Sequence, residues 1–174
     1  MSSVVISGDT SGAITLAAPA VSGTNTATLP AATGTVMVSG NMPAFNVTKS
    51  SGQSITGGVT TKVTFDTETF DTNNNFASDR FTPTAAGYYQ ININLGFGTT
   101  GSAQALLYKN GSQYYGGTAV TYNASIGGVM PLSVMVYMNG STDYLEVYTY
   151  SVLAISISAG STNTQFSGSL VRGA

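Results

Sequence analysis

The side chains that many enzymes use for nucleophilic and metal chemistry are missing from this sequence. Its 174 residues include no His and no Cys. A Ser–His or Cys–His nucleophile pair therefore cannot form, and neither can a zinc site built from Cys and His. Disulfide bonds are also excluded, so stability has to come from packing or from oligomerisation.

Two groups of carboxylates are close enough in sequence to act together. Asp66, Glu68 and Asp71 precede a run of asparagines, and such oxygens on a loop could hold Ca²⁺. The spacing and the glycine of an EF-hand are absent, which favours a solvated turn. Asp143 and Glu146 could form a glycosidase pair, but the alternative is a charge that faces outward beside a turn. We therefore expect no catalytic residue, no metal site, no cofactor and no enzyme activity.

Tyrosines are the other side chains that could bind a ligand. Their rings could stack on the sugars of a host glycan. The alternative for most of them is a position in the core or at a subunit interface, because aromatic rings bury much surface in β-proteins. The tyrosines considered for sugar binding are Tyr114, Tyr115, Tyr122, Tyr137, Tyr148 and Tyr150.

Charged residues are scarce and scattered along the chain. They make up 7% of the residues, whereas about 25% is usual for a soluble domain. No cluster of Lys and Arg marks a nucleic-acid interface. No apolar stretch approaches the ~20 residues of a membrane-spanning helix, and the first residues lack the features of a signal peptide. We expect neither nucleic acid nor a membrane as a partner.

The first 43 residues differ in composition from the rest of the chain. No aromatic residue precedes Phe45, and Asp9 is the single charge in this segment. Short runs of Val, Ile and Thr between Gly, Pro and Asn are typical of strands. Lacking large side chains for a core, residues 1–43 are predicted to form an extended β-rich arm that pairs with other chains; a flexible tail is the alternative. Its candidate anchoring residues are Val5, Ile6, Ile14, Leu16, Leu29 and Val36.

Residues 44–174 have the pattern of a separate all-β domain. From Tyr89 to Phe97 every second residue is apolar, which predicts a strand with one buried face. The dipeptides Asn110–Gly111 and Asn139–Gly140 each lie between strand-like runs and predict two hairpin turns. Strands at this spacing, without helical periodicity, predict a β-sandwich or jelly roll.

Two motifs of this second domain resemble a known family. Phe81-Thr-Pro-Thr-Ala-Ala-Gly87-Tyr-Tyr89-Gln-Ile91 and the closing Phe166-Ser-Gly-Ser-Leu170 are similar to motifs in the globular head of complement component C-one-q and its TNF-like relatives. The resemblance covers about residues 44–172. It implies a jelly-roll β-sandwich that associates as a homotrimer.

The strands that carry these motifs supply candidate residues for the trimer axis. The scarcity of charge favours association, because one sandwich of this size cannot easily hide so much apolar surface. For each candidate residue the alternative is a place in the core of its own chain. The candidates are Tyr89, Ile91, Phe166, Gly168 and Leu170.

The arm resembles a repeat in virion proteins of tailed bacteriophages. The order Ile14-Thr-Leu-Ala-Ala-Pro19, Gly23-Thr-Asn-Thr-Ala-Thr-Leu-Pro30 and Thr33-Gly-Thr-Val36 carries this similarity. In those proteins the repeat precedes fibre or spike domains or attaches them to the particle.

Together the two resemblances imply a structural protein of the virion. The first hypothesis is a capsid decoration (cement) protein, in which a trimeric head sits on the shell and the arms contact the major capsid protein or another virion protein. The second is a short tail or head fibre whose jelly roll binds a host glycan. A bacterial secreted or cellular protein of the same trimeric group is a third, weaker hypothesis.

Overall fold

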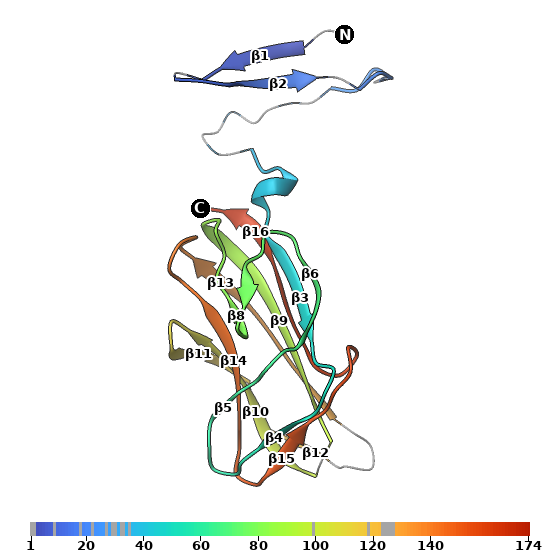
Figure 1. The fold of residues 1–174 in the computed structure, drawn as a ribbon, viewed down its shortest axis with the longest axis vertical. Helices are drawn as coiled ribbons and strands as arrows, with labels where there is room; N and C mark the ends of the chain where they lie inside the picture. The colour runs from blue at the N-terminus through green and yellow to red at the C-terminus, as the bar shows by residue number, and fades with distance from the viewer. Residues whose placement is uncertain are drawn as a thin grey trace. The chain divides into compact units, whose positions relative to one another are not determined.

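The computed structural model describes residues 3–8, 10–17, 19–21, 23–26, 28, 31, 34, 36–98, 100–117, 119–122 and 128–174. Contacts within the chain divide it into two units, Met1–Gly34 and Thr35–Ala174. The described elements are strands, apart from the 3-10 turn η1 (Ser39–Asn41) (Figure 1). No described helix has the length and apolar character needed to span a membrane.

The first unit contains an antiparallel hairpin of β1 (Ser3–Ser7) and β2 (Ala13–Ala17). Each of these strands is rich in Val, Ile, Thr or Ala and lies next to a Gly or Ser turn, as expected for a β-rich arm. The two strands pair with each other, whereas the composition of the arm predicted pairing with other chains.

Residues just before the predicted start of the head already belong to the second unit. The Met37 side chain packs against the core of the head. Asn73 Nδ2 donates a hydrogen bond to the Gly40 carbonyl over 3.1 Å, and the Leu170 N–H donates to the Pro43 carbonyl over 3.0 Å. The contacts therefore join the segment after Gly34 to the head, and strand β3 follows it at Ala44.

In the described residues, the head consists of two seven-stranded antiparallel sheets (Figure 1). The β9 sheet has the order β4–β15–β9–β16–β3–β6, with β13 also on β9. Its strands are β3 (Ala44–Thr48), β4 (Gln53–Ile55), β6 (Thr67–Asp71), β9 (Gly87–Phe97), β13 (Gly128–Met138), β15 (Ile155–Ile157) and β16 (Gln165–Gly173).

The β10 sheet has the order β11–β10–β14–β8–β7, with β12 on β10 and β5 on β14. Its strands are β5 (Thr61–Lys62), β7 (Phe76–Ala77), β8 (Arg80–Phe81), β10 (Gly101–Lys109), β11 (Ser112–Gly116), β12 (Val120–Tyr122) and β14 (Leu145–Ser151). The two sheets face each other across a common core, so the predicted all-β sandwich of the jelly-roll class is confirmed.

The core is built from the alternating residues of the long strands. The predicted buried face of β9 is confirmed, because its five apolar residues from Tyr89 to Phe97 are at most 2% exposed. Phe45 stacks on Phe81 with ring centroids 4.1 Å apart and meets the edge of Phe166 at 4.8 Å. These rings connect the first, middle and last strands of the head.

One of the two predicted hairpin turns is confirmed and the other is wrong. Asn110 and Gly111 have φ values of 53° and 78° and join β10 to β11 in one sheet, as a type I′ turn requires. Asn139 and Gly140 instead lie between β13 and β14, which belong to different sheets. There Asn139 Oδ1 accepts three backbone N–H groups, from Ser141, Thr142 and Asp143.

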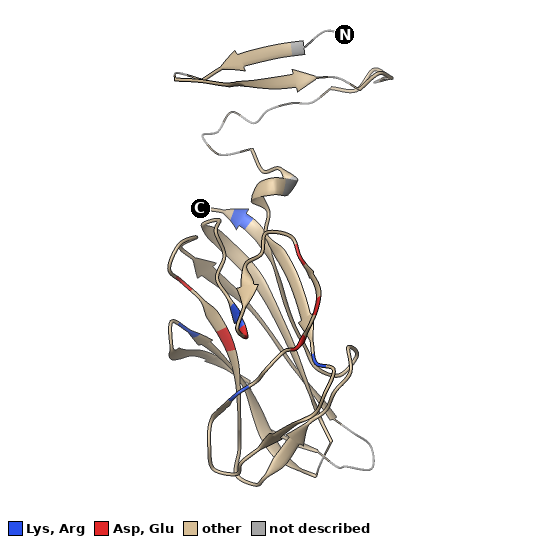
Figure 2. Ribbon diagram, in the orientation of Figure 1, with Lys and Arg blue, Asp and Glu red and all other residues tan. Residues whose placement is uncertain are grey.

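Charged side chains are sparse over the described head (Figure 2). Within the described residues, ion pairs join Glu146 to Lys62 and to Arg80, and Asp143 to Lys109. These pairs connect residues far apart in the sequence, so most of the basic side chains serve contacts within the chain.

Candidate assembly surfaces

The residues predicted for the trimer axis lie in the core of the single chain. Tyr89, Ile91 and Phe166 are 0% exposed and Leu170 is 6% exposed. A Cβ on buried Gly168 would lie 2.6 Å from Ile91 Cδ1, so this glycine allows close packing inside the sandwich. This placement supports the alternative interpretation, in which the five residues form the intrachain core.

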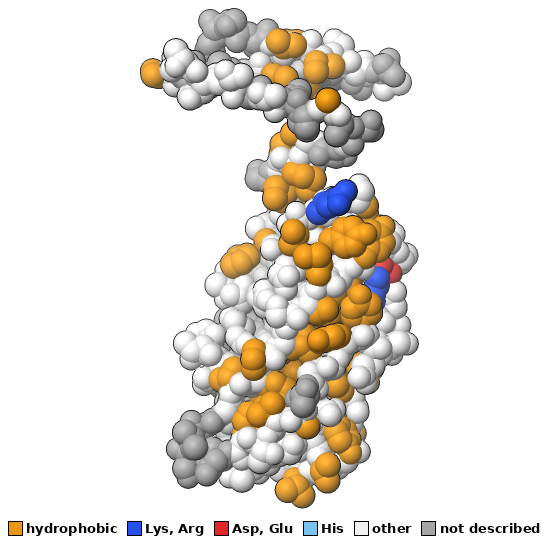
Figure 3. Space-filling view, turned by 180° about the vertical axis from the view of Figure 1, so that it is seen from behind, with side chains coloured by type: hydrophobic (Ala, Val, Ile, Leu, Met, Phe, Trp, Pro, Cys, Tyr) orange, Lys and Arg blue, Asp and Glu red, His pale blue; other side chains and the backbone are white. Residues whose placement is uncertain are grey.

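The outward face of the β9 sheet carries an exposed apolar surface that the sequence analysis missed. We call it the outer stripe, and it consists of Tyr88 on β9 and Val129, Pro131, Met135 and Tyr137 on β13. Met135 is 50% exposed, and the rings of Tyr88 and Tyr137 lie 5.4 Å apart. Figure 3 shows apolar side chains in a diagonal band across this face of the head.

A signal for the outer stripe was present in the sequence of β13. Its inward residues, Met130, Leu132, Val136 and Met138, are at most 5% exposed. The outward positions between them are also mostly apolar, and a strand that is apolar on both faces is typical of burial on both sides. In the single chain only one side of β13 is covered.

A row of polar side chains crosses the same face. Asn46, Ser167, Asn92 and Ser133 are consecutive cross-strand partners on β3, β16, β9 and β13. Ser133 Oγ donates a hydrogen bond to Asn92 Oδ1 over 2.9 Å. Asn46 Oδ1 is buried and has no hydrogen-bond partner among the described residues. A surface laid over this face therefore meets both apolar contacts and hydrogen-bonding groups.

The edge of β13 is protected against the addition of another strand. Among the described strands, β13 pairs only with β9. Pro131 has no N–H to offer, and Lys109 Nζ donates a hydrogen bond of 2.6 Å to the Tyr137 carbonyl near the other end. Pro and Lys at an edge hinder the addition of another strand, so this edge is a poor site for strand pairing.

The predicted anchoring residues of the arm are exposed wherever the structure describes them. Val5, Ile6, Ile14 and Leu16 lie on the β1–β2 hairpin and are 56–68% exposed. Val36 is 70% exposed and belongs to the second unit. Leu29 lies outside the described residues. The described residues of the hairpin thus present a second exposed apolar surface.

The carboxylates Asp143 and Glu146 are held by basic side chains. Burial alone would raise the pKa of Glu146, but hydrogen bonds and charges from Lys62 and Arg80 outweigh it and lower this pKa. The hydrogen bond from Lys109 lowers the pKa of Asp143. A glycosidase needs one carboxyl with a raised pKa as its general acid. This pair therefore has the electrostatics of structural ion pairs.

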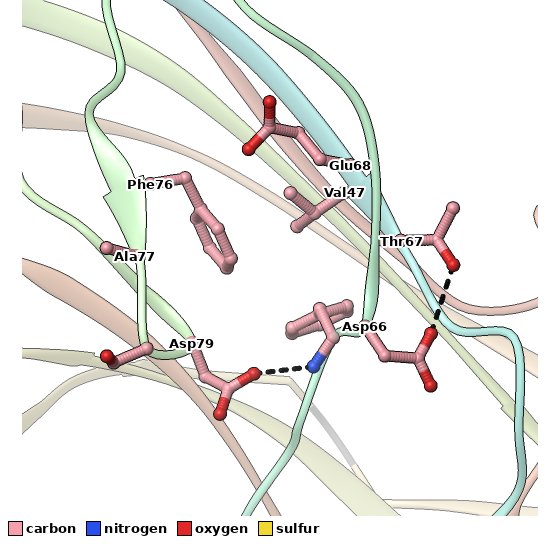
Figure 4. Close-up of a pocket in the computed structure, with 9 residues that line it drawn as sticks. Val47, Asp66, Thr67, Glu68, Phe76, Ala77 and Asp79 are labelled. Atoms are coloured by element: carbon pink, nitrogen blue, oxygen red, sulfur yellow. Dashed lines mark hydrogen bonds between the residues drawn. The ribbon is translucent and has the colours of Figure 1, made fainter.

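The acidic segment around Asp66 borders a pocket of about 330 Å³ between β6 and β7. Figure 4 shows Glu68 and the ring of Phe76 at this pocket, and Asp79 Oδ1 accepts the backbone N–H of Phe65 over 2.7 Å. Asp66 accepts the backbone N–H of Ser50 over 2.6 Å, which lowers the pKa of this carboxyl to about 2. Within the described residues, no three Asp or Glu side chains are grouped closely enough to hold a metal ion.

Asp71, the third carboxylate considered for Ca²⁺, shapes a turn. Its Oδ2 accepts the backbone N–H of Phe76 over 2.7 Å, and its Oδ1 accepts that of Asn73 over 3.4 Å. Its two oxygens therefore hold the turn between β6 and β7, which is the solvated, asparagine-rich turn named as the alternative to calcium binding.

The tyrosines considered for sugar binding occupy different environments. Tyr122 is 5% exposed, and burial raises the pKa of its hydroxyl to about 12. Tyr137 belongs to the outer stripe. Tyr148 is half-buried against Tyr108, with ring centroids 4.1 Å apart, and Tyr150 is also half-buried on the same strand. Tyr114 and Tyr115 on β11 are about half exposed.

No family model and no curated protein sequence matches this chain. Solved structures do resemble it. Murine APRIL at pH 5.0 matches with a TM-score of 0.60 and 10% identity over 75% of this chain and 99% of that chain. The globular domain of the zebrafish complement 1qA protein matches with a TM-score of 0.58 and 16% identity over 76% of this chain and 99% of that chain.

A third similar structure is the vertex protein P5 of PRD1. It matches with a TM-score of 0.55 and 18% identity over 75% of this chain and 97% of that chain. At these identities the likeness concerns the fold. The chain thus folds as a jelly roll of the kind found in TNF-like and complement heads.

Proposed function

We propose that this chain is a structural virion protein, namely a capsid decoration (cement) protein of a tailed bacteriophage. Three heads associate through the outward face of the β9 sheet, and the arms attach the trimer to the major capsid protein. The observation that carries the proposal is the pair of apolar surfaces, the outer stripe and the hairpin, that are exposed among the described residues.

The outer stripe supports self-association of the head. Exposed Val, Met and Tyr side chains lie beside a polar row that includes the unpartnered Asn46 Oδ1. A core of apolar contacts with hydrogen-bonding groups around it is the usual anatomy of a protein interface. A donor on another copy would satisfy the buried amide oxygen.

Two observations support a place in a virion. The arm carries the motif order that resembles phage virion proteins, and the head shares its fold with a vertex protein of the phage PRD1. Three arms on one trimer would give multivalent attachment, so each single contact with the shell can be weak. Such attachment ties shell subunits together without any chemical step.

Deletion of residues 1–34 tests the attachment step. This cut follows the unit boundary, so it leaves the segment that packs on the head intact. We expect the truncated head to remain trimeric by light scattering but to no longer sediment with undecorated capsids. Normal decoration by the truncated head would contradict the role of the arm, and a copy number of a few dozen or fewer per particle would contradict cement.

The alternative function is a short fibre whose head binds a host glycan. The exposed rings of Tyr114 and Tyr115 on β11 and the half-buried Tyr108–Tyr148 pair favour it, because aromatic rings stack on sugars. A glycan array with purified head separates the two functions. Specific binding that is lost in a Tyr114→Ala/Tyr115→Ala variant would support the fibre.

A further inference from the structure

The β1–β2 hairpin has one strongly apolar face. Directly opposed residues of an antiparallel pair point to the same side, and neighbours along a strand point to opposite sides. The register pairs Val4 with Leu16 and Ile6 with Ile14, so these four branched side chains share one face. Thr15 lies on the other face, together with Val5, Ser7, Ala13 and Ala17.

Among the described residues of the first unit, the side chains of this apolar face are largely exposed. The exposed fraction of its four side chains is 62% for Val4, 56% for Ile6, 68% for Ile14 and 57% for Leu16. A single two-stranded hairpin is marginal in water, and a hydrophobic face has to be packed before such a sheet gains stability. A surface that packs on this face would therefore stabilise the hairpin.

Copies of the same hairpin fit this face better than a charged partner. The two strands carry no charged residue, so their faces can pack on identical copies without repulsion between like charges; Asp9, the single charge of the arm, lies in the sequence between the two strands and outside the described residues. A hollow of about 290 Å³ lies at the turn end, lined by Ile6, Ile14 and the turn residues, and it can receive an apolar side chain.

A trimer of heads would also hold three hairpins at a high local concentration. The second and third contacts then become intramolecular events, which need little binding energy each. This step rests on the proposed head trimer, whereas the choice of face rests on the register of the hairpin alone.

We infer that the three hairpins of a trimer pack their Val4, Ile6, Ile14 and Leu16 faces together into one anchoring unit. The occupant of the apolar face is a second and a third copy of this chain. The opposite face, with Thr15, and the outer strand edges remain free to contact the shell. The three hairpins thus form one unit that presents three copies of the Thr15 face to the shell, which keeps the attachment multivalent.

Single cysteines in this cysteine-free chain test the packing directly. Full-length Ile14→Cys is compared with full-length Thr15→Cys, because the two positions are neighbours on β2 but lie on opposite faces. Light scattering first establishes that each variant is a trimer. Mild oxidation and labelling with a bulky maleimide then report contact between copies and exposure of the thiol.

In the trimer, we expect Ile14→Cys to form disulfide-linked dimers in up to about two thirds of the chains, because one thiol of three stays unpaired. Its labelling should be at least about tenfold slower than that of Thr15→Cys. Ile6→Cys is a second variant on the same face and should behave like Ile14→Cys.

Equal labelling of Ile14→Cys and Thr15→Cys in a trimer would overturn the inference and leave the head trimer standing. Protection of both apolar-face cysteines without cross-links would overturn it too, since the cover would then come from the same chain. A monomer in solution would instead overturn the proposed trimer, and this packing with it.

Discussion

Glu146 shows how a nearly uncharged chain uses a charge. Its Oε1 lies 2.9 Å from both Lys62 Nζ and an Arg80 guanidinium nitrogen, and its Oε2 accepts the Tyr148 hydroxyl over 3.3 Å. Arg80 also lies over the ring of Tyr144, 3.8 Å from its centroid. These contacts join β5, β8 and β14 on the outward side of the β10 sheet, so the carboxylate holds short strands in place.

The pH dependence of stability should reveal this role. Since the folded pKa of Glu146 is lowered, its contribution is full above the ordinary Glu value of about 4.3 and is lost as the pH falls through the folded pKa. Glu146→Gln should lower the free energy of unfolding by about 1–2 kcal/mol at pH 7, a value reduced because both basic partners are partly exposed.

Urea unfolding at pH 7 and at pH 3 measures this effect. The difference between the variant and the unsubstituted protein should be smaller at pH 3, because the contribution of a lowered folded pKa begins to be lost once the pH falls below the ordinary Glu value. Glu68→Gln serves as the control, because Glu68 is exposed and should change stability little at either pH. A deficit of equal size at both pH values would mean that the glutamine disturbs packing and that the charge matters little.

At the scale of elements, β13 is apolar on both sides, and one of these sides is exposed. One side of this strand closes the core through Met130, Leu132 and Val136. The other side presents Met135 and Tyr137 to solvent in the single chain. Pro131 and Lys109 hinder extension of the sheet at this edge, so the proposed trimer uses the outward face.

Met135→Glu tests this face. Met135 is 50% exposed, so a glutamate there should leave the fold of the head intact. In the proposed trimer it would bury three unpaired carboxylates, at a cost of several kcal/mol. We expect the variant to be a monomer at micromolar concentration by light scattering, with an unchanged circular dichroism spectrum.

Leu153→Glu is the matched control for Met135→Glu. Leu153 is 61% exposed but lies in the turn between β14 and β15, away from the outer stripe. Its substitution should leave the trimer mass unchanged. If the Met135→Glu protein remains trimeric, the interface of the trimer lies on a surface other than the outer stripe.

The sequence allowed the elements to be predicted better than their partners. Alternation along β9 correctly predicted its buried face, and Asn110–Gly111 correctly predicted a hairpin, because both signals act between near neighbours. The same dipeptide at Asn139–Gly140 predicted a second hairpin, and this prediction was wrong. The sheet that β13 and β14 each join depends on long-range packing, and the two strands lie in different sheets. Alternation also shows that Tyr89 and Ile91 share an apolar face, but it does not tell whether that face meets the chain itself or a copy.

At the scale of the whole molecule, the scarcity of charge leaves few charged side chains for contacts between chains. Most of the cations in the described head already serve ion pairs or hydrogen bonds within the chain, as with Lys62, Arg80 and Lys109. The outer stripe itself carries no charged residue. Association through such a surface depends on apolar burial and hydrogen bonds, both of which are little affected by ionic screening.

This composition predicts a trimer that is insensitive to salt. Between 20 mM and 1 M NaCl the Debye length falls from about 20 Å to about 3 Å, which would weaken an interface held by exposed ion pairs. For the outer stripe we expect a dissociation constant that changes less than about threefold, measured by sedimentation equilibrium. A loss of affinity of tenfold or more at 1 M NaCl would contradict the apolar interface and implicate the few charges near its rim, such as Arg172 and the Lys109–Asp143 pair. Lys109→Met would then separate the contribution of Arg172 from that of the Lys109–Asp143 pair, because it removes this ion pair and the hydrogen bond to the Tyr137 carbonyl without substituting any residue of the outer stripe.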